Sequence, residues 1–76
     1  MTHGLPSLTP RKVIRALERG GFFIHYTTGS HYALRHSHHP SLRVVVPYHN
    51  NDLKRGTLRS IIKQTGLTVE EFVQLL

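Results

Sequence analysis

His31 is the residue in this sequence best placed to do chemistry, because it directly follows Gly29 and Ser30 in a predicted turn. Imidazole has an unperturbed pKa of about 6.5, so it accepts or donates a proton near neutral pH. A glycine lets the backbone approach an anion closely, and neighbouring N–H groups then act as donors. This combination predicts proton transfer beside a bound anionic group. In the alternative, residues 28–30 only form a turn, and His31 is an ordinary, half-exposed strand residue.

The other histidines allow two further hypotheses. His49 follows Pro47 at a predicted strand end, where it is either a second proton-transfer group or a hydrogen-bonding residue within a loop. A cluster after the second predicted strand contains His36, His38 and His39. Imidazole binds zinc, nickel or copper, but zinc sites usually have three or four protein ligands, and no carboxylate or thiolate lies beside the cluster. We therefore expect turn-forming residues there and no metal site.

Positive charge predicts a polyanionic partner. The chain has ten Lys and Arg residues against four Asp and Glu, a formal net charge of +6, and this balance attracts nucleic acids or acidic proteins. The candidate phosphate contacts lie at and after the start of the second predicted helix: Lys54, Arg55, Arg59 and Lys63. The alternative is a solvent-exposed basic face. Tyr26, Tyr32 and Tyr48 are either platforms for unpaired bases or, more commonly in a small sheet, packed residues.

The hydrophobic pattern predicts a helix, three strands and a second helix, in this order. Thr9 and Pro10 are typical of a helix start, and Gly20 and Gly21 of its end. Aromatic and β-branched residues then alternate with other residues in three short segments: 22–27, 31–36 and 42–46. Helical spacing returns after an irregular stretch and continues to Gly66.

A short C-terminal helix follows, since Thr68 and Glu71 have the spacing of a capping box. Short turns favour antiparallel neighbours, so the strands should form a meander with one face against the helices. The predicted fold class is α+β, with the order αβββα and a short extra helix, which is the architecture of double-stranded-RNA-binding domains. We expect one domain over residues 1–76, with residues 1–8 as a flexible N-terminal arm.

Composition argues against several other classes of protein. The chain contains no cysteine, so it has neither a disulfide framework nor a zinc–thiolate site. No apolar run approaches the roughly 18 residues of a membrane span, and residues 1–6 lack the pattern of a secretory signal. We therefore expect a cytoplasmic protein that does not interact with membranes.

Four blocks of residues together resemble the HicA toxin family of bacterial toxin–antitoxin systems. They are Gly21-Phe22 at the start of a strand, Gly29-Ser30-His31, Val46-Pro47-Tyr48-His49, and the segment LKRGTLRSIIKQTGLT over residues 53–68. Their order and spacing make the match specific, and it covers the chain from about Thr9 to the C-terminus. The sequence departs from the family pattern at Tyr26 and Thr28, where many relatives are expected to have basic or amide-bearing residues. Contacts with RNA near the hairpin are therefore expected to differ.

The resemblance implies a double-stranded-RNA-binding-domain-like fold, ribosome-independent cleavage of single-stranded messenger RNA, and neutralisation by a HicB-type antitoxin. The family's essential histidine falls on His31, and Gly29 and Ser30 beside it are predicted RNA contacts. Attack by a 2′-hydroxyl needs a group that takes its proton, a donor for the leaving oxygen and positive charge on the phosphorane, all of which imidazole, Lys and Arg supply without a cofactor. The alternative is a non-catalytic RNA-binding module of the same fold. Sequence-specific DNA binding by this chain is not expected, because no predicted helix resembles a groove reader.

Overall fold

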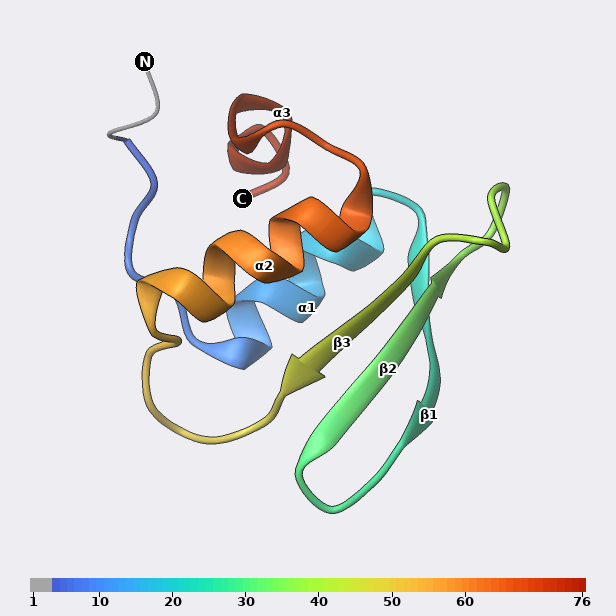
Figure 1. The fold of residues 1–76 in the computed structure, drawn as a ribbon, viewed down its shortest axis with the longest axis horizontal. Helices are drawn as coiled ribbons and strands as arrows, with labels where there is room; N and C mark the ends of the chain where they lie inside the picture. Colours follow the sequence, from blue (N-terminus) through green and yellow to red (C-terminus); the bar gives the residue numbers. More distant parts are fainter. Residues whose placement is uncertain (1–3) are drawn as a thin grey trace.

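The computed structural model describes residues 4–76 and has the predicted order of elements (Figure 1). The elements are α1 (Pro10–Arg19), β1 (Phe22–Thr27), β2 (His31–His36), β3 (Arg43–Pro47), α2 (Arg55–Thr65) and α3 (Val69–Val73). The strands form one antiparallel sheet in the order β1-β2-β3. The predicted α+β fold, with a three-stranded meander and a short C-terminal helix, is therefore confirmed. Within residues 4–76, no helix is long and apolar enough to cross a bilayer.

The ends of the helices follow local sequence signals. The Thr9 hydroxyl accepts a hydrogen bond from the first turn of α1, and Gly66 ends α2 with a left-handed φ of 78°. Thr68 and Glu71 form the predicted capping box, in which each side chain accepts from the other residue's backbone N–H. These groups satisfy helix-terminal donors and acceptors that have no partner within the helix itself. At the end of α1, the positive φ of 97° belongs to Gly21.

The third strand is shifted by one residue from its predicted position. Leu42 donates its backbone N–H to the carbonyl of His39, and this bond places it in the β2–β3 turn. Strand β3 therefore starts at Arg43, which pairs with Arg35, and it extends to Pro47, which pairs with His31. Pro47 is tolerated because β3 is an edge strand.

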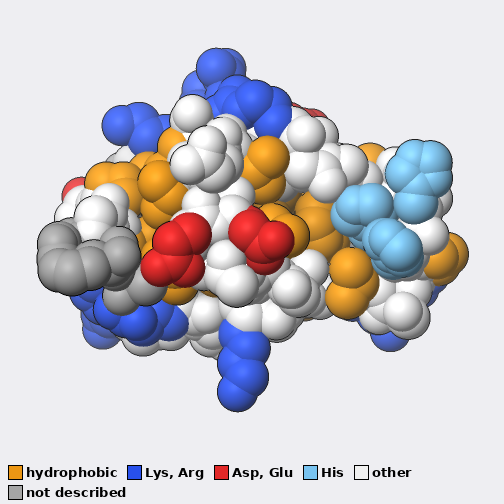
Figure 2. Space-filling view, turned by 90° about the horizontal axis from the view of Figure 1, so that it is seen from above, with side chains coloured by type: hydrophobic (Ala, Val, Ile, Leu, Met, Phe, Trp, Pro, Cys, Tyr) orange, Lys and Arg blue, Asp and Glu red, His pale blue; other side chains and the backbone are white. Residues whose placement is uncertain are grey.

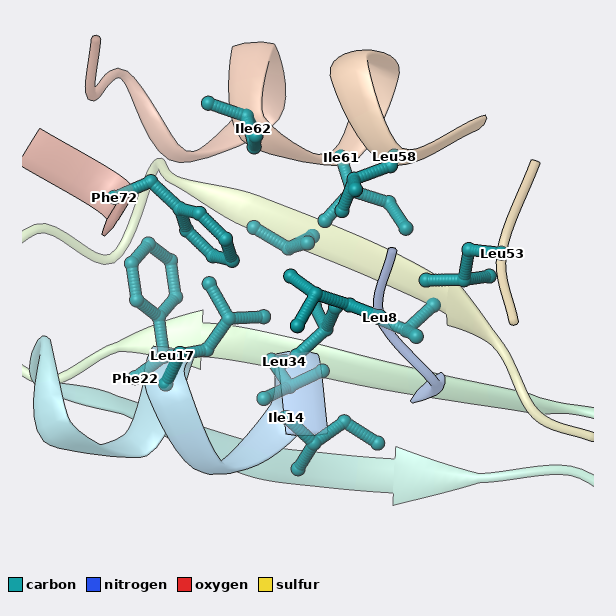
Figure 3. Packing of buried hydrophobic residues seen from close by; sticks show 14 of the residues in the cluster. Leu8, Ile14, Leu17, Phe22, Leu34, Leu53, Leu58, Ile61, Ile62 and Phe72 are labelled. Atoms are coloured by element: carbon teal, nitrogen blue, oxygen red, sulfur yellow. The ribbon is translucent and has the colours of Figure 1, made fainter. Parts of the chain in front are cut away.

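The core lies between the helices and one face of the sheet. Figure 3 shows Leu17 of α1, Leu34 of β2 and Ile61 of α2 pointing toward this common interior, with Phe72 of α3 at one end. Burying each such side chain contributes roughly 1.5–3 kcal/mol, so a small chain depends on every one of them.

The segment before α1 is part of this core. Leu5 and Leu8 are buried, the Leu8 carbonyl accepts from the Leu53 N–H at 2.8 Å, and Arg55 Nη1 donates to the Leu5 carbonyl at 2.6 Å. Residues 5–8 thus differ from the flexible arm expected over 1–8, because a small core gains from any apolar side chain that reaches it. The first three residues of that predicted arm lie outside the described residues.

Strand β1 is much less covered than its alternating sequence predicts. A register shift between Ile24 and Tyr26 places Tyr26 opposite Ala33, on the face away from the helices. Ile24 keeps its inward register but remains 39% exposed, because α1 and α2 lie mainly over β3 and the start of β1 (Figure 1). The sheet therefore has a covered side at β3 and an open side at the β1–β2 hairpin.

Candidate active site at the first hairpin

The backbone of His31 is held by strand β3 on one side and by the turn residue Thr28 on the other. His31 is the first residue of β2 and pairs with Pro47 of β3. On the other side, its carbonyl accepts from the Thr28 N–H at 2.8 Å, and its own N–H donates to Thr28 Oγ1 at 3.1 Å. The preceding carbonyl, that of Ser30, accepts from the Tyr48 N–H at 2.8 Å. The side chain of His31 is nevertheless exposed, so a fixed backbone presents an accessible imidazole.

Thr28 has a structural role that the sequence interpretation missed. Two-residue hairpin turns usually need positive φ angles, yet Gly29 has none here. The hydroxyl of Thr28 closes the turn instead, by accepting from the N–H of His31. The available signal was the general tendency of Ser and Thr hydroxyls to bond backbone groups within turns.

Ser30 orients the imidazole of His31. Its Oγ lies 3.0 Å from Nδ1 of that ring. When Nδ1–H donates to the hydroxyl, Nε2 is an acceptor that can take a proton; when the hydroxyl donates to Nδ1, Nε2 carries the proton and can give it. In both tautomers the bond engages Nδ1 and leaves Nε2 to face a substrate. Ser30, predicted as an RNA contact, is therefore placed against the histidine.

His49 lies near the same end of the sheet, two residues beyond the strand partner of His31. It is exposed, and its Nδ1 accepts from the Asn51 N–H at 3.2 Å. This bond gives His49 a role in its loop, with a backbone N–H as partner. Participation in proton transfer remains a prediction.

Three of the four predicted basic contacts gather at the start of α2. Lys54 is the N-cap residue and makes no side-chain cap bond, and the first turn contains no acidic residue. The N–H groups of this turn and the nearby Arg59 therefore form a positive region, since a helix N-terminus carries partial positive charge. Arg55 also belongs to this region, although Nη1 bonds to the N-terminal segment. Lys63 lies in the last turn, about 12 Å further along the helix axis.

A short loop connects the hairpin end of the sheet to this positive region. Strand β3 ends beside the β1–β2 turn, and residues 48–54 run from there to the start of α2 (Figure 1). Tyr48, at the start of the loop, stacks on Tyr32 of β2 with ring centroids 4.3 Å apart and planes at 16°. Both rings are half-buried against the core. Tyr32 and Tyr48 are therefore packed residues, and among the three tyrosines Tyr26 is left as the exposed ring.

Two glycines in this region are not required by the fold. A Cβ atom at Gly29 or Gly56 would meet nothing within 4 Å, and neither residue has a positive φ. Gly56 even lies in the first turn of α2, where glycine costs roughly 0.5–1 kcal/mol relative to alanine. Both positions therefore leave the backbone open to close approach by a ligand. Sequence reasoning singled out Gly29 but not Gly56.

Within the histidine cluster near the β2–β3 turn, His36 has a structural role. Nε2 of His36 bonds the Gly20 carbonyl at 3.1 Å, and its Nδ1 accepts from the His38 N–H at 3.0 Å. The ring of His36 also packs edge-on against Phe22, with centroids 4.9 Å apart. Figure 2 shows histidine side chains gathered at one end of the molecule. Residues 4–76 nevertheless contain no group of three His, Cys, Asp or Glu residues arranged to hold a metal.

Fold and site together define a protein of the double-stranded-RNA-binding-domain type with an exposed histidine at its first hairpin and a basic helix start nearby. The family model described as the HicA toxin of bacterial toxin–antitoxin systems matches residues 10–67. The chain therefore belongs to the HicA toxin family. It is the toxin of a toxin–antitoxin system, and its family implies a HicB antitoxin as partner. No curated protein matches the chain.

Proposed function

We propose that this protein is a ribosome-independent endoribonuclease that cleaves messenger RNA in the cytoplasm with His31 and thereby inhibits translation. The observation that carries the proposal is the combination found at this residue. Its backbone is fixed by β3 and by Thr28, its ring is exposed, and Ser30 holds Nδ1 at 3.0 Å. A reacting group held in one orientation needs little reorganisation during the reaction, which is a main source of catalytic rate.

The proposed reaction is in-line attack of a ribose 2′-hydroxyl on the adjacent phosphate. The new O–P bond forms a 2′,3′-cyclic phosphate, and the bond to the 5′-oxygen of the next nucleotide breaks. Nε2 of His31 either takes the proton of the 2′-hydroxyl or gives one to the leaving 5′-oxygen, and His49 is the candidate for the other step. No cofactor takes part. In-line geometry requires local rotation of the RNA backbone, which a single strand permits.

The positive region at the start of α2 is proposed to bind the RNA backbone. Phosphates gain from the charges of Lys54, Arg55 and Arg59 and from the backbone N–H groups of the first turn. Such groups also stabilise the extra negative charge of a phosphorane. Gly29 and Gly56 leave room for phosphates to approach the backbone. Lys63 would contact RNA only if the strand continues along α2.

The proposal is tested by incubating purified protein with a long single-stranded messenger RNA in EDTA and separating the products on a denaturing gel. The variants are His31→Ala and, as a matched control, His38→Ala, which removes another exposed imidazole. We expect cleavage by the wild type and by His38→Ala, and none by His31→Ala although a gel shift shows retained RNA binding. Intact RNA in every lane with a retained shift would favour a non-catalytic binding module. Cleavage that EDTA abolishes would contradict the absence of a cofactor.

A further inference from the structure

A groove lies beside α1, in a part of the molecule that the proposed reaction does not use. We call it the α1 groove; its volume is about 280 Å³, and it is lined by Leu8, Lys12, Arg15, Arg19 and Leu76. The three basic residues are exposed and belong to α1, whereas the two leucines lie before α1 and after α3. The α1 groove therefore depends on the fold, which brings residues 8 and 76 to the same helix.

The residues after α3 are fixed against the end of α1. Nε of Arg19 donates to the Leu75 carbonyl at 2.6 Å, and a Cβ atom at Gly20 would lie 2.8 Å from Cδ1 of Leu75. The bond uses one of the five donors of a guanidinium group. It holds the Arg19 side chain at the α1 groove and leaves its two Nη groups available to an anion.

The positive charge of the α1 groove does not serve the helix. Arg15 lies three residues after Lys12 and four before Arg19, and like charges at these spacings destabilise a helix. Glu18, the one acidic residue of α1, does not line the groove. A bound anion would remove the repulsion, so charge complementarity indicates an anionic ligand.

The chemistry of the α1 groove suits one nucleotide of a longer strand. A guanidinium fork binds two oxygens of a phosphate at once, while Leu8 and Leu76 offer apolar contact to a base or a ribose. The volume is slightly below the roughly 300–1,000 Å³ of small-molecule sites. An open groove of this size fits a segment whose neighbouring nucleotides continue outside it.

The N-terminal segment connects the α1 groove to the positive region at the start of α2. The Leu5 carbonyl accepts from Arg55 in that region, and Leu8, three residues later, lines the groove. Three residues of chain span at most about 10 Å. Helices α1 and α2 also begin at the same end of the molecule (Figure 1). A strand bound at the start of α2 is therefore long enough to reach the α1 groove after a few nucleotides.

We propose that the α1 groove is a second RNA-binding site, which holds a stretch of the substrate outside the active site. The inference rests on the proposed function, because it adds a binding site for the same substrate. Its continuity with the positive region favours RNA over an acidic protein. The consequence is a preference for long RNA, since a strand that engages both sites binds more tightly than either site alone provides. The proton transfers at His31 are not affected.

The test compares Arg15→Glu in the α1 groove with a matched charge reversal elsewhere, Arg43→Glu. Both residues are exposed, and Arg43 lies on β3 at the opposite end of the sheet from His31. Cleavage kinetics use RNAs of about 5 and about 25 nucleotides, near the lower limit of single-strand site sizes and beyond the upper one. Affinity for the long RNA is measured by fluorescence anisotropy at several salt concentrations, in proteins that also carry His31→Ala. Thermal unfolding checks the fold.

Arg15→Glu should change substrate binding and leave the chemical step unchanged. We expect KM for the long RNA to rise at least about fivefold with kcat unchanged, and kcat/KM for the short RNA to stay at the wild-type value. The slope of log Kd against log salt should fall by about 0.7 for each phosphate contact that is lost. Arg43→Glu should affect the two RNAs equally.

Equal losses on both RNAs in Arg15→Glu, or wild-type kinetics on both, would overturn the proposal. Unchanged RNA affinity together with a loss of affinity for the HicB-type antitoxin would overturn it too, and would assign the α1 groove to an acidic protein. Failure of the proposed endoribonuclease activity has a different signature. In that case the wild type cleaves neither RNA, while Arg15→Glu still weakens binding of the long RNA.

Discussion

Two histidines at opposite ends of β2 show how one residue type acquires different roles. His36 is half-buried, has both ring nitrogens hydrogen-bonded, and packs edge-on against Phe22. His31 is exposed, and Ser30 engages its Nδ1 alone. Because the two are five residues apart on a strand, they also point to opposite faces. The number of ring nitrogens that the fold occupies thus separates a structural imidazole from a chemically available one.

The largest difference between His31 and His36 is expected in catalysis. His31→Ala should reduce the rate of RNA cleavage by roughly 10²–10⁴-fold, the usual contribution of a proton-transfer group. The free energy of unfolding should change by less than about 0.5 kcal/mol, because an exposed side chain with one local bond is removed. Initial rates on a fluorescent RNA and urea unfolding measure the two quantities. A variant that keeps more than a tenth of wild-type activity contradicts the proposed role.

The reverse result is expected for His36→Ala. The Gly20 carbonyl and the His38 N–H both lose their partner, which should cost roughly 1–3 kcal/mol of stability. Each kcal/mol corresponds to a fall in Tm of about 4–8 °C for a domain of this size. The cleavage rate per folded molecule should stay at the wild-type value. His38→Ala is the control. Equal stability of the two variants would show that the His36 ring does not stabilise the contact between the end of α1 and the β2–β3 turn.

Gly21→Ala tests the same contact from the residue that faces the His36 ring. Gly21 has a φ of 97°, and a Cβ atom there would lie 2.7 Å from Nε2 of His36. The left-handed backbone alone costs alanine about 1–2 kcal/mol, and the steric conflict adds to this. Combining Gly21→Ala with His36→Ala removes the conflict, so the double variant should be more stable than the sum of the two single effects predicts. Strict additivity in urea unfolding would argue against the close contact.

A smaller effect is expected at Ser30. Removing the hydroxyl by Ser30→Ala frees the ring of His31, and the loss of about 0.5–1.5 kcal/mol for one hydrogen bond corresponds to roughly 2–13-fold in rate. Ser30→Thr, which retains a hydroxyl, should restore most of the activity. RNA affinity in a gel shift should not change. An affinity loss equal to the rate loss would mean that Ser30 contacts RNA, as the sequence interpretation held.

The smallest effect on the fold is expected at Gly29 and Gly56. Either glycine replaced by alanine should leave stability unchanged or raise it by about 0.4–1 kcal/mol, since each site has open space and no positive φ. RNA affinity should fall at low salt if phosphates approach these backbones. If both variants bind RNA with wild-type affinity, close approach of RNA does not explain why these two positions are glycine. Fluorescence anisotropy with a short RNA measures the change.

Helix boundaries were predictable because their causes are local. The capping residues act on backbone groups only a few positions away, at the end of the same helix. They are Thr9, Gly66, Thr68 and Glu71, whose side chains or backbone angles provide partners for the unpaired N–H and C=O groups at these helix ends. The strands were also correct to within one residue, and the family blocks located His31 at the first hairpin. Its catalytic role stays a prediction.

By itself, the sequence determined the order of elements, the helix caps and the excess of positive charge, all of which depend on residue type and short spacing. Only the tertiary structure decided which side of the sheet carries Tyr26 and whether Leu5 joins the core. It also decided that both ring nitrogens of His36 are hydrogen-bonded while His31 is exposed. These outcomes depend on contacts between residues far apart in the chain, such as Arg55 with Leu5. Alternating patterns indicate two faces of a strand but not which stretch the helices will cover, because coverage follows from the packing of separate elements.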